Sequence, residues 1–212
     1  MKLLDEADEL RKLRAQADHR TAALLPALFH KMFGDPATNP ERWPVMKLIE
    51  VTSPKQWPTI TQDQLTASGF PVYGANGRIG FYSAFNHETP TVLITCRGAT
   101  CGTINVCAPK SYVTGNAMAL DDPNPELLNV SFLESVLRVR GVQDTITGTA
   151  QPQITRQSLA RVSFPVPALP LQQEFAQRVA EIRAMETAQA ASRQRLESLF
   201  QSLLHRAFNG EL

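Results

Sequence analysis

The chain has 212 residues, of which 43% are hydrophobic and 19% are charged, an ordinary composition for one large globular domain or two small ones. Lys and Arg total 21 against 20 Asp and Glu, so the net charge of +1 indicates neither a nucleic acid nor a membrane as partner. The chain opens MKLLDEADEL without a signal-peptide pattern, and its apolar runs fall short of the about 20 residues of a membrane span. These features predict a cytoplasmic protein without membrane contact.

The three cysteines, Cys96, Cys101 and Cys107, are odd in number and clustered in one short region without a CxxC pair. This spacing fits no disulfide framework and favours buried thiols over a zinc site.

The N-terminal segment shows the heptad spacing of a helix that packs along another helix. Its seam advances by four and three residues alternately, through Leu3, Ala7, Leu10, Arg14, Ala17, Thr21, Leu24 and Leu28. Pro26 lies inside this run and predicts a kink, because proline removes a helical hydrogen bond and crowds the preceding turn. Gly34-Asp35-Pro36 then ends the helix.

A second long helix is predicted over residues 169–209, with Pro170 in its first turn. Its stretch RLESLFQSLLHRAF, from Arg195 to Phe208, echoes RTAALLPALFHKMF, from Arg20 to Phe33. Two related helices that bracket a different domain are expected to pack antiparallel as a stalk. The stalk residues singled out by this echo are Leu24, Leu28, Phe33, Leu199, Leu203 and Phe208.

The middle of the chain alternates short apolar or β-branched runs with Gly, Pro and Asn, which predicts strands. The predicted strands are Val45–Val51, Phe70–Tyr73, Thr91–Thr95, Thr103–Cys107, Ala117–Leu120 and Val162–Val166. One helix is predicted from Pro125 to about Val139, with Asn124 as its cap. The predicted class is therefore α+β: a mixed α/β head over 43–168 on two long antiparallel helices, over 1–35 and 169–209.

Loops of the predicted head carry the side chains best suited to base edges. The stretch Tyr73–Gly80 contains an Asn-Gly turn, Arg97–Gly102 follows a strand, and Thr145–Thr155 is rich in hydroxyls and amides. Arginine pairs with guanine, Gln or Asn with adenine, and Ser or Thr with several acceptors. The candidate DNA-binding residues are Tyr73, Asn76, Arg78, Arg97, Thr100, Lys110, Thr147, Gln151 and Gln153.

The same loops are also compatible with plain surface turns, and the glycines around Arg97–Gly102 lack the GKS or GKT of a nucleotide site. Local charge favours DNA. The segment from Gly69 to Lys110 contains three cations, Arg78, Arg97 and Lys110, and one acid, Glu88. A chain that is nearly neutral in total can therefore present a basic face.

No catalytic constellation emerges from the spacing of titratable residues. His19, His30 and His205 fall on the predicted helices, which leaves His87 alone in the middle domain. Asp121, Asp122 and Glu126 can be drawn as a metal site, but a loop and the acidic first turn of a helix explain them more simply. The sequence predicts no catalytic residue, metal or cofactor.

Three segments resemble the specificity subunit of type I restriction–modification enzymes: VYGANGRIGFY, QPQIT, and PVPALPLQQE leading into a long helix that ends LLHRAFNGEL. The resemblance implies a target-recognition domain between two helical regions. It implies a non-catalytic subunit that binds double-stranded DNA and docks methyltransferase and restriction subunits through its helices. S-adenosylmethionine would bind the methyltransferase subunit, because adenine methylation requires the base to flip into that subunit's pocket.

The family has two recognition domains where this sequence has one. Three alternatives follow: one chain reads half a target, a homodimer presents two heads, or the sequence is a piece of a longer subunit. Two other classes stay open. One is a coiled-coil scaffold for proteins, in keeping with the neutral charge, and the other is a small DNA-modifying enzyme, which would need a cofactor loop or carboxylate cluster.

Overall fold

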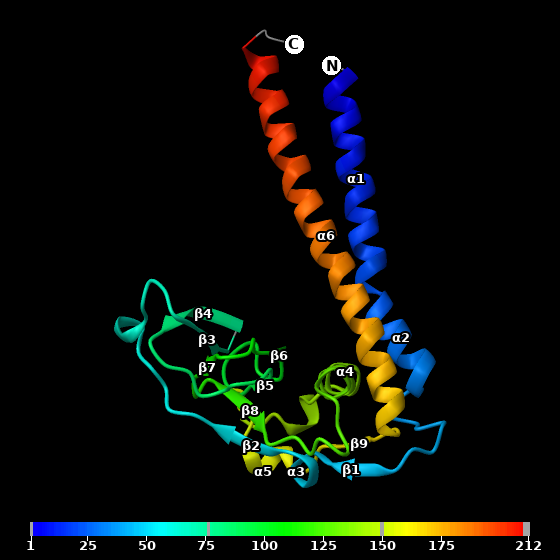
Figure 1. Ribbon diagram of the computed structural model, residues 1–212, viewed down its shortest axis with the longest axis vertical. Helices are drawn as coiled ribbons and strands as arrows, with labels where there is room; N and C mark the ends of the chain where they lie inside the picture. Colours follow the sequence, from blue (N-terminus) through cyan, green and yellow to red (C-terminus); the bar gives the residue numbers. More distant parts are fainter. Residues whose placement is uncertain (1, 76, 149–150, 210–212) are drawn as a thin grey trace. The chain divides into compact units, whose positions relative to one another are not determined.

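The computed structural model describes residues 2–75, 77–148 and 151–209 (Figure 1). The helices are α1 (Lys2–Ala22), α2 (Leu24–Phe33), α3 (Leu48–Val51), η1 (Gln62–Gln64), α4 (Val130–Arg140), η2 (Gln143–Thr145), α5 (Arg156–Leu159) and α6 (Leu169–Phe208). The strands are β1 (Val45–Lys47), β2 (Ser53–Gln56), β3 (Phe70–Gly74), β4 (Gly77–Tyr82), β5 (Val92–Thr95), β6 (Ile104–Val106), β7 (Tyr112–Val113), β8 (Ala117–Asp121) and β9 (Ser163–Pro165). The predicted α+β class is confirmed.

The chain divides into two compact units. One consists of Met1–Leu28 with Gln177–Leu212, and the other of Phe29–Ala176. The division therefore falls inside α2 and inside α6, whereas the predicted ranges 1–35, 43–168 and 169–209 follow the ends of the helices. None of the helices in the described part of the chain is both long and apolar enough to cross a membrane.

In the two-helix unit, α1 runs antiparallel to α6 (Figure 1). The order of the contacts shows this direction: Gln189 donates to Thr21 at 2.9 Å and Arg14 donates to Ser192 at 2.9 Å, while Arg11 pairs with Glu197 at 3.0 Å. The Arg11 guanidinium also lies 4.4 Å from the Phe200 ring centroid. Polar and charged side chains thus join residues 11–21 of α1 to residues 189–200 of α6.

The predicted apolar seam is wrong at Leu10 and Leu24. Ala7 and Thr21 are buried, but Leu10 and Leu24 are 49% and 42% exposed. The contact with α6 is made in part by Arg11, whose guanidinium pairs with Glu197 and lies over the Phe200 ring.

The expected kink at Pro26 is a break between two helices. α1 ends at Ala22, four residues before Pro26, where the proline ring would crowd the helical carbonyl group. The Ala23 N–H donates to Arg20 O at 3.2 Å, and α2 begins at the next residue.

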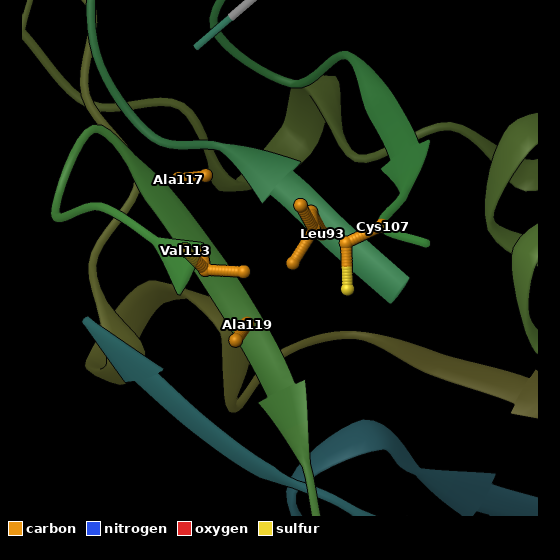
Figure 2. Packing of buried hydrophobic residues seen from close by; sticks show 5 residues of the cluster. All are labelled: Leu93, Cys107, Val113, Ala117 and Ala119. Carbon is orange, nitrogen blue, oxygen red and sulfur yellow. The ribbon is translucent and has the colours of Figure 1, made fainter. Parts of the chain in front are cut away.

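The head unit, Phe29–Ala176, is built on an antiparallel sheet with the strand order β2-β8-β5-β6. A second sheet has the order β4-β3-β7, with β3 and β7 parallel. Val113 of this second sheet packs with residues of the first, namely Leu93, Cys107, Ala117 and Ala119 (Figure 2). Trp57 and Tyr73 are packed, partly buried, against the same cluster.

An aromatic cluster lies inside the head unit, which includes the second half of α2 and the first residues of α6. Phe29 and Phe33 of α2 contact Phe132 of α4 and Phe175 of α6, with ring centroids 5.1 to 6.1 Å apart. Phe33 was predicted as a stalk residue, but it is 4% exposed and belongs to this core.

Three local predictions are corrected by the structure. The predicted strand Val45–Val51 ends at Lys47, because Glu50 accepts the Lys47 N–H at 3.0 Å and starts the short helix α3. The predicted helix from Pro125 begins only at Val130, and its cap is Asn129, whose side chain accepts from the Ser131 N–H. Strands β2, β4 and β7 were not predicted.

Candidate nucleic-acid interface

The first candidate loop is a hairpin turn between β3 and β4. Tyr73 pairs with Arg78 and Gly74 pairs with Gly77 across it, and Gly77 has a φ of 90° that favours glycine. The predicted turn is therefore present, flanked by strands. Asn76, predicted to contact DNA, lies outside the described residues.

Arg78 and Tyr73 differ in how much of each side chain is available to a ligand. Arg78 is exposed, with its guanidinium carbon 5.5 Å from the Phe81 ring centroid. Tyr73 is half-buried against the sheet cluster, and its backbone oxygen accepts from the Thr114 N–H at 2.9 Å. Tyr73 thus holds the base of the hairpin, and Arg78 is the residue there that can reach outward.

The second candidate loop, residues 97–102, connects β5 to β6. Gly98 and Gly102 have φ values of 84° and 91°, and the Gly102 N–H donates to Thr95 O at 2.8 Å, which closes the loop on its own strand. Arg97 and Thr100 are exposed. Burial raises the pKa of the Cys101 thiol in this loop, so the thiol stays neutral near pH 7 and is a poor nucleophile.

The third candidate loop, within residues 145–155, is joined to the second by backbone hydrogen bonds. Thr147 and Gln153 exchange two backbone hydrogen bonds of 2.9 Å each, and Gln153 also forms an antiparallel bridge with Arg97. The Gly98 N–H donates to Pro152 O at 3.2 Å, and the Ile154 N–H donates to Cys96 O at 2.9 Å. The order Arg97, Gln153, Thr147 is therefore fixed by backbone bonds.

The side chains of this small ladder face solvent. Arg97, Thr147 and Gln153 are exposed, as is Gln151 in the turn that follows Gly148. The turn between β3 and β4 lies close to the end of β5. The hydroxyl of Thr95, the last residue of β5, donates to Ala75 O in that turn. The structure thus brings the predicted loops together at the end of β5.

Lys110 is separate from this group. β7 runs parallel to β3, with Tyr112 opposite Val72, so Lys110 lies toward the start of β3, whereas the hairpin turn lies at its end. The Lys110 ammonium is 3.8 Å from a Glu88 carboxylate oxygen, which offsets its charge. Its predicted role in DNA binding gains no geometric support.

The cations of the loops are not neutralised within the part of the chain that the structure describes. Across residues 2–75, 77–148 and 151–209, neither Arg78 nor Arg97 forms an ion pair. Exposed guanidinium groups without carboxylate partners are suited to phosphate oxygens and to guanine edges.

His87 is buried and lies in a hydrogen-bonded network. Its Nε2 is 2.9 Å from Asp121 Oδ1 and its Nδ1 is 2.6 Å from Asn86 Oδ1, while Trp57 donates to Asp121 Oδ2 at 3.0 Å. Both ring nitrogens thus contact oxygens of the protein, which suits a structural role. No group of three or more His, Cys, Asp or Glu that could hold a metal occurs among the described residues.

Exposed Arg, Gln and Thr side chains gathered at one end of a sheet are chemically suited to the base edges and phosphates of DNA. The chain belongs to the family described as the type I restriction modification DNA specificity domain, which residues 40–197 match. The resemblance inferred from the sequence is confirmed.

Solved structures share the fold. The S subunit of the type I restriction–modification system of M. genitalium superposes with a TM-score of 0.70 at 20% identity, covering 96% of this chain and 58% of that one. The HsdS subunit of Thermoanaerobacter tengcongensis gives a TM-score of 0.59 at 22% identity, covering 100% and 56%.

A chain from a study of complex assembly and conformational transition in the type I R-M system gives a TM-score of 0.69 at 24% identity. The match covers 100% of this chain and 57% of that one. This chain thus spans less than two thirds of the length of each of these structures. Comparison with the curated proteins gives no match.

Proposed function

We propose that this chain is the sequence-reading component of a type I restriction–modification complex and that one chain reads one half of a DNA target. The observation that carries the proposal is the backbone ladder that holds Arg97, Gln153 and Thr147 side by side and exposed. Arginine and glutamine make the commonest bidentate contacts to guanine and adenine, and a rigid ladder fixes their order along the groove.

The two-helix unit is the proposed docking surface for methyltransferase and restriction subunits. Several large apolar side chains of this unit are exposed. They include Leu10, Leu13, Leu24, Met185, Leu199 and Phe208, which are 42% to 88% exposed. Exposed apolar surface of this kind is typical of protein interfaces.

Catalysis is assigned to the partners in this proposal. The chain supplies recognition, while methyl transfer from S-adenosylmethionine to a flipped adenine takes place in the methyltransferase subunit. A bipartite target would be read by this recognition domain together with a second one, which another recognition domain or a second copy of this chain would supply.

The proposal is tested by co-expressing the chain with its methyltransferase subunit and mapping methylated adenines in the host DNA. A defined half-site or palindrome is the expected result. Adenine methylation without any sequence pattern, or no methylation, contradicts the proposal.

A salt titration of DNA binding by the same complex distinguishes the proposed DNA-reading function from that of a protein scaffold. Binding to target duplex is expected to weaken steeply with salt, because Lys and Arg release counterions from phosphates. Arg97→Ala and Arg78→Ala should weaken binding further, while Arg195→Ala, which removes an exposed arginine from α6, should not. Binding that is equally weak for all four proteins and insensitive to salt favours the scaffold.

A further inference from the structure

Gln56 is the last residue of β2, and it is exposed at the edge of the four-stranded sheet. Its amide nitrogen donates to Gly115 O at 3.0 Å and lies 3.1 Å from Cys96 Sγ. The Gly115 carbonyl oxygen can only accept, so the amide cannot be turned around. Both N–H groups of Gln56 are therefore used inside the protein, and its side-chain carbonyl oxygen is the group left for a ligand.

The anchor places Gln56 beside the ladder described above. Gln56 lies opposite Met118, and Met118 lies opposite Ile94, which puts Gln56 at the end of β5 that leads into Cys96 and Arg97. Cys96 O accepts from the Ile154 N–H at 2.9 Å, next to Gln153. Gln56 thus contacts Cys96, which precedes Arg97 in the chain. Cys96 is also hydrogen-bonded to Ile154, which follows Gln153.

Cys96 forms a neutral anchor for Gln56. The thiol is buried, and burial raises its pKa, which keeps the S–H intact near pH 7. The Sγ atom lies 3.5 Å from Gly115 O, so the thiol can donate to that oxygen while its lone pairs accept from Gln56. This closed set of contacts fixes the rotation of the Gln56 amide.

We propose that Gln56 reads one DNA position as a hydrogen-bond acceptor only, and that it selects an amino base, adenine or cytosine, over a keto base, guanine or thymine. The inference rests on the proposed DNA-binding function and adds a residue and a rule to it. A free glutamine reads adenine by donating to N7 and accepting from N6. With its donors occupied, Gln56 retains only the second contact, which cytosine N4 satisfies equally in the major groove.

The test is selection from a pool of randomised duplexes by the chain in complex with its methyltransferase subunit. Gln56→Met keeps the length of the side chain and removes its polar atoms. The wild type is expected to enrich A or C at one position, and Gln56→Met to lose this preference by about two- to ten-fold there, the value of one neutral hydrogen bond. Gln173→Met, at an exposed glutamine of the head unit outside the proposed docking surface, should leave the selected motif unchanged.

Cys96→Ala controls for lost packing, because it removes one anchor and leaves the bond to Gly115. It is expected to keep the amino-base preference. The inference is overturned if Gln56→Met selects the wild-type motif with the same stringency, or if Cys96→Ala loses the preference as fully as Gln56→Met. A wild type that enriches no motif would instead refute the proposed function itself.

Discussion

Arg97 and Gln153 lie opposite each other in an antiparallel bridge that joins the loop after β5 to the loop before α5. The bridge sets the spacing between a guanidinium and an amide at the surface of the head. A backbone held by such bonds has little conformational freedom left to lose on binding, which favours specificity.

The first prediction concerns Arg97→Lys. Lysine keeps the charge but cannot present the planar fork of donors that matches a guanine edge. We expect the salt dependence of DNA binding to be nearly unchanged and the preference at one base position to relax by about 1–3 kcal/mol. Competition binding with single-base variants of the selected duplex measures both quantities. If all variants weaken in parallel, Arg97 contacts phosphate instead.

Gly148→Ala should distort the third loop without unfolding the head. Gly148 has a φ of 82°, and an added Cβ would lie 2.7 Å from Gln151 O. Gly98→Ala is the matched control, since Gly98 has a φ of 84° but open space around its Cβ position. In each variant alanine adopts a positive φ, which costs about 1 kcal/mol. Only Gly148→Ala adds a clash with a backbone atom. We expect the larger loss of DNA affinity in Gly148→Ala, and equal losses would show that the clash is relieved locally.

The sequence predicts which side chains the loops carry. It does not predict that the loops of Arg97 and Gln153 are hydrogen-bonded to each other. Arg97 and Gln153 stand in loops whose composition indicates base contacts, but no periodicity pairs two segments so far apart in the chain. The run VLIT of β5 shows the β-branched pattern of a buried strand and was predicted.

The strand SPKQ of β2 shows no such pattern, because it is an edge strand in which Pro54 alone is buried. Gln56 was missed for that reason. Asn124 was predicted as the helix cap with Pro125 in the first turn, yet its side chain accepts from the Glu126 N–H in a turn. The helix starts later, at Val130, with Asn129 as its cap.

Gln172 is predicted to be the most costly glutamine to remove. It is fully buried, accepts from the Asn129 N–H at 2.9 Å, and donates to Leu127 O at 2.8 Å and Pro167 O at 2.7 Å. Gln172→Ala removes the side-chain partner of one buried and two partly buried backbone groups, so we expect the free energy of unfolding to fall by about 3 kcal/mol. Denaturant titration measures the change.

The neighbouring Gln173→Ala is the control, because Gln173 is exposed and its loss should change the free energy of unfolding by less than about 0.5 kcal/mol. Similar values for the two variants would mean that water replaces the lost bonds of Gln172.

The last prediction concerns docking by the two-helix unit. Leu199 is 51% exposed and Leu203 is half-buried on the same helix, so charges there are expected to block a partner more than to unfold α6. Leu199→Asp with Leu203→Asp should abolish co-purification with the methyltransferase subunit while the melting temperature of the head is kept. Gln194→Asp adds a charge at an exposed position of α6 and should leave co-purification intact. Partner binding that survives the double substitution would place the docking surface elsewhere, and loss of the head's melting transition would show that this end of α6 supports the head.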